Sequence, residues 1–391
     1  MRYKIILLLL AITIIGTSAK HFNEEYWGFF GHRLINKTAV FTLPVELVPL
    51  YKSNIDFITE HSVDPDKRRY ASPLEAVRHY IDLDIFGTYP FDNVPRQFPE
   101  ALATFGEIHV VTRVERDTIV SWDSDVIWSE VFDEGKKEQW SQELKGKTYK
   151  LLDEGFLYMP KSWVPKEYRK SNHELIFIER LTQYGMLPYH LSLYQYRLTK
   201  AFKEKNWPIV IRLSTEMGHY LSDAHVPLHT TENYNGQLTG QDGLHAFWES
   251  RIPELFATDH YDFFVGRAQY IEDTDAFFWD VILESHSHVE EVLTKELEIR
   301  NSFDKDKQYC FEERGANTTR LECRAYAKAY QDAMAGMVED RMRKSILALG
   351  SVWFTAWVDG GRPDVSAHLP KMNVDTLKIL QSDSLAIQNP K

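Results

Sequence analysis

The sequence predicts a mainly α-helical protein folded as one large domain. Apolar residues recur at helical spacing over several long stretches of the chain. Strands do not alternate with helices, and no glycine-rich phosphate loop is present, which argues against a doubly wound α/β sheet. No Gly/Ser linker, proline-rich hinge or repeat divides the 391 residues. We therefore expect residues 20–391 to form a single helical domain.

The first residues are typical of a secretory signal. A basic start precedes an apolar run of eleven residues, and small residues follow at Thr17 and Ala19. This run is too short to span a bilayer. We expect residues 1–19 to be removed by cleavage near Ala19 and the protein to be exported, either to a periplasm or out of the cell. No stable membrane span and no protein partner are expected.

Four stretches carry the helical pattern. They are residues 44–61, 206–226, 243–256 and, as one or two long helices, 319–356. We expect Pro253 to kink or break the third of them. Residues 110–170 differ, because runs that could form short strands lie in a polar stretch punctuated by tryptophans. We interpret this part as an aromatic-rich insertion that forms a rim or lid. Its tryptophans are Trp122, Trp128, Trp140 and Trp163.

Charge and cysteine content limit the classes of function. The formal net charge is −12, and an acidic chain is poorly suited to tight, sequence-independent binding of duplex nucleic acid. A hydrolase that meets phosphate through bound metal ions stays compatible with this charge, because the ions supply local positive charge. The two cysteines, Cys310 and Cys323, enclose a short loop. In an oxidising compartment we expect them to form a disulfide.

The densest group of titratable residues lies between positions 219 and 249. His219 and Asp223 are four residues apart, as are His245 and Glu249, so each pair shares one face of a helix. His229 follows a proline that ends the first of these helices. Alone, such a pair is most often a surface ion pair or a hydrogen-bonded histidine. Two pairs with a histidine between them, in an apolar and aromatic setting, favour a metal site that suits zinc.

Two upstream segments add candidate ligands. His32 lies in an aromatic setting five residues after Trp27. The segment Asp64-Pro-Asp66 precedes His79, and Tyr80 follows that histidine directly. Taken separately, the aspartates are equally consistent with a turn and His79 with a hydrogen-bonded core histidine.

These motifs together resemble the superfamily of zinc-dependent phospholipases C and S1/P1-type single-strand nucleases. They are Trp-x4-His, an aspartate fifteen residues before His-Tyr-Ile-Asp, His-x3-Asp-x5-His, and His-x3-Glu, and they run in the family's order from Trp27 to Glu249. The residues from 257 onward match no motif of the family. The resemblance implies a multi-helix domain that binds up to three zinc ions in one cleft.

The resemblance also implies a set of ligands. One ion would be held by His79, His219, Asp223 and an aspartate of the 64–66 segment, a second by His229, His245 and Glu249, and a third by Asp223, His32 and Trp27. Asp64 has the spacing of the nucleases and is preferred, whereas Asp66 has an Asp-x-x-Arg pattern also found there. The expected cleavage leaves seven residues before Trp27. Either trimming exposes its amine, or its carbonyl acts with His21, Glu24 or Glu25, or the third ion is weakly bound.

By the same resemblance, the protein is expected to be a zinc-dependent phosphodiester hydrolase that acts through a metal-bridged hydroxide. Asp223 and Asp64 would be the catalytic carboxylates, and Tyr80 and Arg69 would contact the substrate. Glu249 and the short gap from His229 resemble the phospholipases C, which we favour slightly. The alternatives are a single-strand endonuclease and a non-catalytic exported binding protein stabilised by zinc.

Overall fold

A computed structural model describes most of the chain. It covers residues 29–69, 72–115, 118–119, 133–164, 166, 173–314 and 317–365. Several predictions concern residues outside these ranges. They are the signal peptide over residues 1–19 with its cleavage near Ala19, the metal ligand Trp27 and its neighbours His21, Glu24 and Glu25, and the tryptophans Trp122 and Trp128.

The described residues are mainly helical, which confirms the predicted class. The helices are α2 (Phe29–Ala39), α3 (Val48–Ser53), α4 (Ile55–Glu60), α5 (Asp64–Arg68), α6 (Pro73–Ala76), α7 (Phe98–Phe105), α9 (Glu134–Leu144), α10 (Thr148–Glu154), α11 (Leu187–Lys203), α12 (Trp207–Ala224), α13 (Leu244–Ala246), α14 (Ile252–His260), α15 (Thr274–Ser287), α16 (Val289–Ser302), α17 (Arg324–Ala333) and α18 (Met337–Asp359). No helix in these ranges is both long and apolar enough to cross a bilayer.

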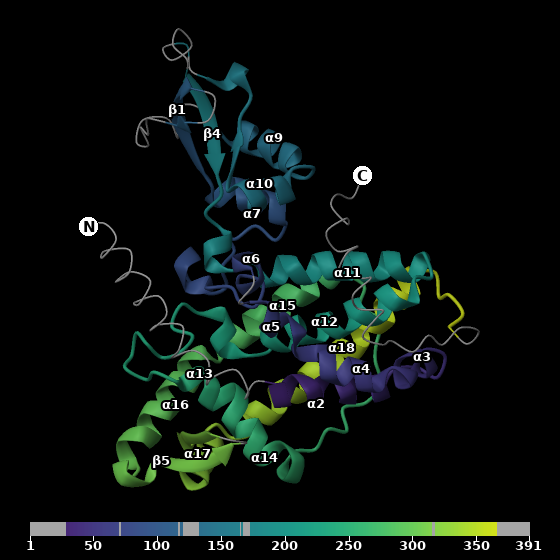
Figure 1. Cartoon of the computed structure of the whole chain (residues 1–391), viewed down its shortest axis with the longest axis vertical. Helices are drawn as coiled ribbons and strands as arrows, with labels where there is room; N and C mark the ends of the chain where they lie inside the picture. The colour runs from purple at the N-terminus through teal and green to yellow at the C-terminus, as the bar shows by residue number, and fades with distance from the viewer. Residues whose placement is uncertain are drawn as a thin grey trace, which may run out of the picture.

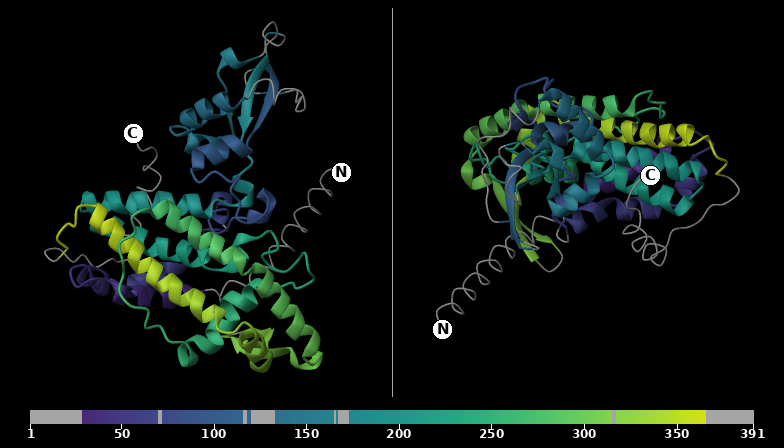
Figure 2. Two further views of the ribbon diagram at one scale, coloured as in Figure 1. Left: turned by 180° about the vertical axis from the view of Figure 1, so that it is seen from behind. Right: turned by 90° about the horizontal axis from the view of Figure 1, so that it is seen from above.

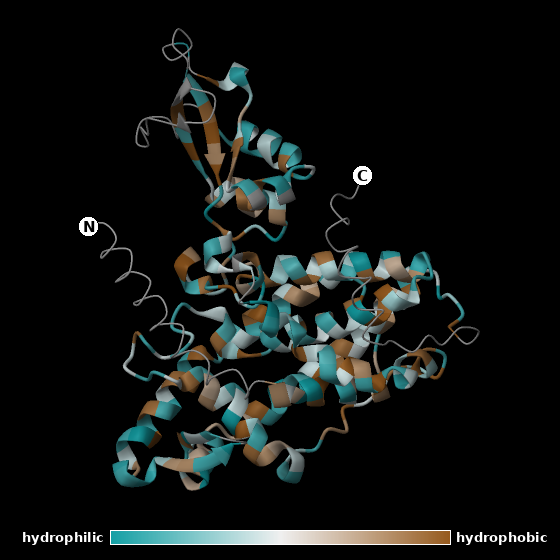
Figure 3. Cartoon of the chain, in the orientation of Figure 1, coloured by the Kyte–Doolittle hydropathy of each residue, from teal (hydrophilic) through white to brown (hydrophobic). Residues whose placement is uncertain are grey.

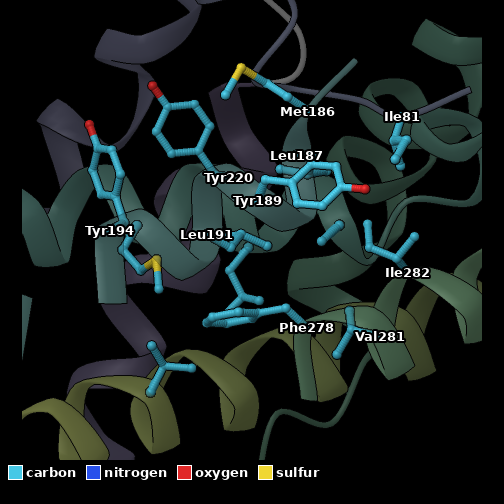
Figure 4. Close-up of a cluster of buried hydrophobic side chains, with 14 of the residues drawn as sticks. Ile81, Met186, Leu187, Tyr189, Leu191, Tyr194, Tyr220, Phe278, Val281 and Ile282 are labelled. Carbon is cyan, nitrogen blue, oxygen red and sulfur yellow. The ribbon is translucent and has the colours of Figure 1, made fainter. Parts of the chain in front are cut away.

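Helix α12 is the centre of the helical body. Nearly every residue from Val210 to Ala224 is buried, because α2, α11 and α18 pack around it (Figure 1). Figure 4 shows one side of this core, where Tyr194 of α11 lies beside Tyr220 of α12, with ring centroids 5.3 Å apart. Polar residues carried on α12 are therefore forced into the interior.

A small sheet and three helices project from one side of the body (Figures 1 and 2). The strands β1 (Glu107–Glu115), β2 (Thr118–Ile119), β3 (Phe156–Tyr158) and β4 (His173–Ile178) are antiparallel, in the order β2-β1-β4-β3. Hydrophobic residues mark β1 and β4 in Figure 3, as is typical of half-buried strands. Trp140 of α9 is fully buried against Trp163 and Phe177, so it is a core residue of this unit.

The predicted helix from Thr319 is corrected at its start. Residues Tyr309–Arg314 (β5) and Asn317–Glu322 (β6) form an antiparallel hairpin, and α17 begins only at Arg324. Pairing with β5 overrides the local helical pattern, and a disulfide joins Cys310 to Cys323, whose Cα atoms lie 5.0 Å apart. The expected disulfide thus joins β5 to the residue directly before α17.

Pro253 does not end its helix. It lies in the first turn of α14, and a π-helical segment, Phe247–Arg251, connects α13 to α14. The π-helical turn lies directly before Pro253, which has no N–H to donate to the preceding turn, so the hydrogen-bond pattern changes there without ending the helix. The chain therefore continues in helical form from Leu244 to His260.

A glycine allows α2 and α12 to approach closely. Asn36 of α2 donates from Nδ2 to the carbonyl of Thr215, at 2.9 Å, and its Oδ1 lies where a side chain on Gly218 would be. A Cβ at position 218 would stand 1.9 Å from that oxygen. This approach is what brings His32 of α2 next to His219, whose ring centroids are 4.0 Å apart.

We predict that Gly218→Ala destabilises the protein by roughly 1–3 kcal/mol, because the added methyl group forces the two helices apart. Urea unfolding followed by circular dichroism measures this change. Gly135→Ala in α9 is the control, since a Cβ there meets only an ordinary contact at 3.5 Å. Equal unfolding midpoints for Gly218→Ala and the wild type would contradict the close packing.

Candidate metal centre

Helix α12 supplies the two central residues of the candidate site. His219 and Asp223 lie one turn apart, and both are buried. Four other parts of the chain meet them: α2 with His32, α5 with Asp66, the segment after α6 with His79, and the segment from Pro227 to Glu249. Five histidines and three carboxylates gather there in three groups, of which the first two share His219: His32–His219–Asp223, Asp66–His79–His219 and His229–His245–Glu249.

The first group to consider is Asp66, His79 and His219. His219 Nε2 lies 3.6 Å from Asp66 Oδ1 and 3.1 Å from His79 Nδ1, while His79 Nδ1 lies 3.8 Å from the same Asp66 oxygen. Tetrahedral zinc with ligands at about 2.0–2.2 Å requires ligand atoms about 3.3–3.6 Å apart. The three side chains therefore fit one ion.

Asp223 lies between this group and His32. Its Oδ2 is 2.9 Å from His79 Nδ1 and 3.5 Å from His219 Nε2. Its Oδ1 is 3.5 Å from His32 Nε2. The two carboxylate oxygens thus face different histidines, an arrangement that suits a carboxylate shared by two neighbouring ions.

The third group comes from the chain after α12, between residues 229 and 249. His229 Nε2 lies 3.0 Å from His245 Nε2 and 3.3 Å from Glu249 Oε2. His245 Nε2 lies 2.6 Å from the same oxygen. The other oxygen of Glu249, Oε1, is 3.5 Å from His32 Nε2, so Glu249 connects this group to the rest of the centre.

Hydrogen bonds outside the groups fix two of the imidazoles. The Ser222 hydroxyl donates to a backbone carbonyl of its own helix, so its oxygen accepts from His32 Nδ1 at 2.6 Å. His229 Nδ1 donates to the carbonyl of His79 at 2.7 Å. In both residues the proton is therefore on Nδ1, and the lone pair of Nε2 points into the site. Metal-binding histidines are oriented in this way.

Electrostatics favour neutral histidines and a cation between the carboxylates. Burial lowers the pKa of His79, His219 and His229, which leaves them in the neutral form that binds metals. Burial also raises the pKa of Asp223, and the negative charges of Glu249 and Asp66 raise it further. A bound cation would lower the pKa of Asp223, since it neutralises the carboxylates that repel one another.

The structure brings Asp66 into the centre in place of Asp64, the aspartate preferred from the sequence. Asp64 Oδ2 lies 2.6 Å from His61 Nδ1, and Asp64 Oδ1 accepts from Lys67 at 2.9 Å. Asp64 and Asp66 both lie in the short helix α5. They are separated by one residue, which turns their side chains to different sides of the helix, so only one can face His79.

The predicted substrate contacts lie beside the centre. Arg69 Nη1 is 3.5 Å from Asp66 Oδ1, and its positive charge partly opposes the rise in the pKa of Asp223. Tyr80 is partly buried and donates to the carbonyl of Gln183 at 3.3 Å. The sequence reasoning missed Tyr234, which is 49% exposed and packs edge-on against His245. Its place in a loop between two ligand segments was the available signal.

Two titratable side chains close to the ligands in sequence, those of Arg68 and His225, have partners outside the three groups. Arg68 is held by Glu216 at 2.9 Å, and His225 Nδ1 lies 2.7 Å from the carbonyl of Leu221. Burial and the charge of Arg341 lower the pKa of His225 to about 3. His225 belongs to none of the three groups, as its spacing from Asp223 indicates.

Access to the centre is one-sided. The side chains of His219, His79 and Asp223 are at most 1% exposed. Asp66, His245 and Glu249 are 14–22% exposed. Solvent therefore reaches the groups from the side of these three residues.

No protein-family model matches this chain, and searches of curated proteins and of solved structures find no match.

We predict that Asp66→Asn weakens zinc binding by about tenfold or more, because it replaces a charged ligand by a neutral amide. Asp64→Asn is the matched control and should retain zinc as the wild type does. Zinc content is measured by mass spectrometry after dialysis against a competing chelator. If Asp64→Asn loses zinc and Asp66→Asn does not, the placement of the two aspartates is reversed.

Proposed function

We propose that this chain is a zinc-dependent phosphodiester hydrolase with the fold and ligand set of the phospholipase C and S1/P1 nuclease superfamily. The observation that carries the proposal is Asp223, whose two oxygens face His32 on one side and His79 with His219 on the other. Five histidines and three carboxylates converge there, in the order of the motifs along the chain. Up to three zinc ions are proposed, with Trp27 as a further ligand.

The ligands divide among the proposed ions as follows. Asp66, His79, His219 and Asp223 would hold one, His229, His245 and Glu249 a second, and Asp223 with His32 and Trp27 a third. Bound zinc lowers the pKa of water to near neutrality and neutralises charge on the phosphoryl oxygens. The protein's own contribution is to hold the ligand atoms in place, to keep the histidines neutral and to admit substrate from the side of Asp66.

A catalytic centre is favoured over a structural one. Structural zinc sites are closed by four protein ligands, whereas catalytic sites keep a position open. The group of His229, His245 and Glu249 offers three ligand atoms, and two of these residues are partly exposed. A non-catalytic, zinc-stabilised binding protein is therefore the weaker alternative.

A small phosphodiester, such as a phospholipid head group, is the substrate class we favour, with a single-stranded nucleic acid as the alternative. Three acidic residues, Asp82, Asp84 and Glu232, lie together on the side of Tyr80. Burial, and then the charges of Asp84 and Glu232, raise the pKa of Asp82 to about 7, so Asp82 is fully charged only above neutral pH. Asp82 is an electrostatic neighbour of Tyr80. Carboxylates at this position would repel a polyanionic strand more than a compact substrate. Arg69 would contact the phosphate and Tyr80 the rest of the substrate.

We also propose that the protein is exported. The disulfide between Cys310 and Cys323 supports this, because such bonds persist in oxidising compartments.

The activity is tested with purified protein loaded with zinc. We expect hydrolysis of bis(p-nitrophenyl) phosphate that is lost on chelation and restored by zinc. Phosphatidylcholine and single-stranded DNA are then compared, and faster cleavage of the lipid is expected. Faster cleavage of DNA would replace the lipid assignment by the nuclease alternative. Zinc binding without hydrolysis of any of the three would favour the non-catalytic alternative.

We predict that Asp223→Asn is the most damaging single ligand change. Its loss disturbs two ion positions, so the rate should fall by more than the roughly 10–100-fold that is typical when a residue behind a ligand is changed. Initial rates with bis(p-nitrophenyl) phosphate and zinc content are measured together. Asp64→Asn should keep its rate. A wild-type rate in Asp223→Asn would contradict the shared carboxylate.

A further inference from the structure

The hairpin of β5 and β6 forms, together with α17, a unit beside the metal centre. This unit lies against α14 and against the π-helical segment Phe247–Arg251 (Figure 1). None of the eight residues of the three ligand groups belongs to it. The segment that it contacts carries Glu249, so any influence of the unit on the centre passes through that segment.

The π-helical segment faces both the centre and the hairpin unit. Residues two positions apart on a helix point to nearly opposite sides, so Phe247 and Arg251 point away from Glu249, which lies between them in the sequence. Glu249 faces the centre, where its Oε2 is 2.6 Å from His245 Nε2. Phe247 stacks on Tyr326 of α17, with ring centroids 5.3 Å apart. The contacts of Phe247 and Arg251 with the unit therefore fix the backbone that carries Glu249.

Arg251 joins this segment to the hairpin. It is 2% exposed, and it donates from Nη1 to Glu312 Oε2 at 3.1 Å and from Nη2 to Glu312 Oε1. Its Nε donates to the backbone carbonyl of Glu322 at 3.0 Å. A bidentate pair fixes the direction of a guanidinium as well as balancing its charge, and a buried cation is costly without such partners. The hairpin therefore sets the orientation of Arg251.

The disulfide holds both partners of Arg251 in place. Cys310 is two residues before Glu312 on β5, and Cys323 directly follows Glu322 at the end of β6. A two-stranded hairpin alone is only marginally stable in water. The bond between the cysteines closes its open end, which excludes conformations in which the strands separate where Arg251 binds.

The charges around Arg251 balance one another. Arg314 donates to Glu254 of α14, and it donates to Glu312 Oε2 at 3.1 Å. Arg251 Nη1 lies 3.6 Å from Glu254 Oε2. The hydrogen bond from Arg251 lowers the pKa of Glu312, so this carboxylate is charged at neutral pH. Two guanidinium groups and two carboxylates thus connect the hairpin to α14 without a net charge, so the cluster joins two parts of the chain rather than binding an ion.

We propose that Arg251 is a positioning residue for Glu249, and that the disulfide-closed hairpin supports zinc binding at His229, His245 and Glu249 through it. Arg251 directs its guanidinium toward the hairpin and acts through the backbone of the π-helical segment. The inference rests on the zinc binding of the proposed function, but not on hydrolysis or on the substrate.

Zinc affinity tests this role. Each protein is loaded with zinc and titrated with a chelator, and the ions retained are counted by native mass spectrometry. We expect Arg251→Gln to bind one zinc ion about tenfold more weakly than the wild type, the lower end of what is typical when a residue that orients a ligand is changed. Arg251→Lys keeps the charge without the bidentate geometry, so its affinity should lie between the two.

Arg324→Gln is the matched control. Arg324 is exposed and also joins α17 to α14, since it donates to the carbonyl of Leu255 at 3.0 Å. This variant should bind zinc as the wild type does. Equal zinc binding by Arg251→Gln and Arg324→Gln would overturn the proposal.

A double-variant comparison separates positioning of Glu249 from a general loss of stability. Glu249→Gln weakens the ligand itself. If Arg251 acts through Glu249, adding Arg251→Gln to Glu249→Gln should lower the zinc affinity little further. An undiminished tenfold loss in the Glu249→Gln background would contradict the proposed role of Arg251.

Two other changes cover the case in which Arg251→Gln fails to fold. Replacing both Cys310 and Cys323 by serine removes the cross-link without creating thiols that bind zinc, and Glu312→Gln alters a side chain that is 37% exposed. Both should weaken the same ion, and wild-type affinity in both would overturn the proposal. Hydrolysis is measured in parallel. Zinc binding without hydrolysis by the wild type would overturn the proposed activity alone, whereas absence of zinc binding would overturn both.

Discussion

The burial of Asp223 constrains the rest of the centre. A carboxylate that is 1% exposed loses its hydration, and neighbouring carboxylates raise its pKa further. Such a group persists in a folded protein only when cations or hydrogen-bond donors surround it. Here His79 and His219 lie next to Asp223, and burial lowers the pKa of both, so these two neutral imidazoles cannot supply the charge themselves. The arrangement is therefore most stable with positive ions between the side chains, which ties the fold of α12 to the proposed metal binding.

A second buried network brings the distant ligands to α12. Arg68 bonds to Glu216 at 2.9 Å, and Glu75 accepts from the Tyr220 hydroxyl and from Arg78. These contacts fasten α5, which carries Asp66, and α6, which precedes His79, to the same helix that carries His219. The network alternates charges and leaves no carboxylate alone, so its stabilisation depends on every member being present. The position of the first ligand group thus rests on residues that do not touch it.

Much of this could be predicted from the sequence, because the relevant patterns are local. Helical spacing identified α12 and paired His219 with Asp223, and the mainly helical class was correct. The choice between Asp64 and Asp66 could not be made, since it depends on which side of a one-turn helix faces His79. The β5–β6 hairpin was missed because strand pairing overrides local propensity.

Helix α11 contacts both the segment that carries His79 and a cleft beside the projecting unit. On one side, the N–H of Met186 donates to the carbonyl of Val77 at 2.7 Å, and that of Leu187 to the carbonyl of Tyr80 at 3.2 Å. These bonds hold the backbone on either side of His79. In addition, Met186 and Tyr189 line a cleft of about 470 Å³ that is also lined by residues of α7, α10 and α15. Packed helices move as units rather than deform locally. A shift of α11 would therefore move the backbone around His79 and the wall of this cleft together.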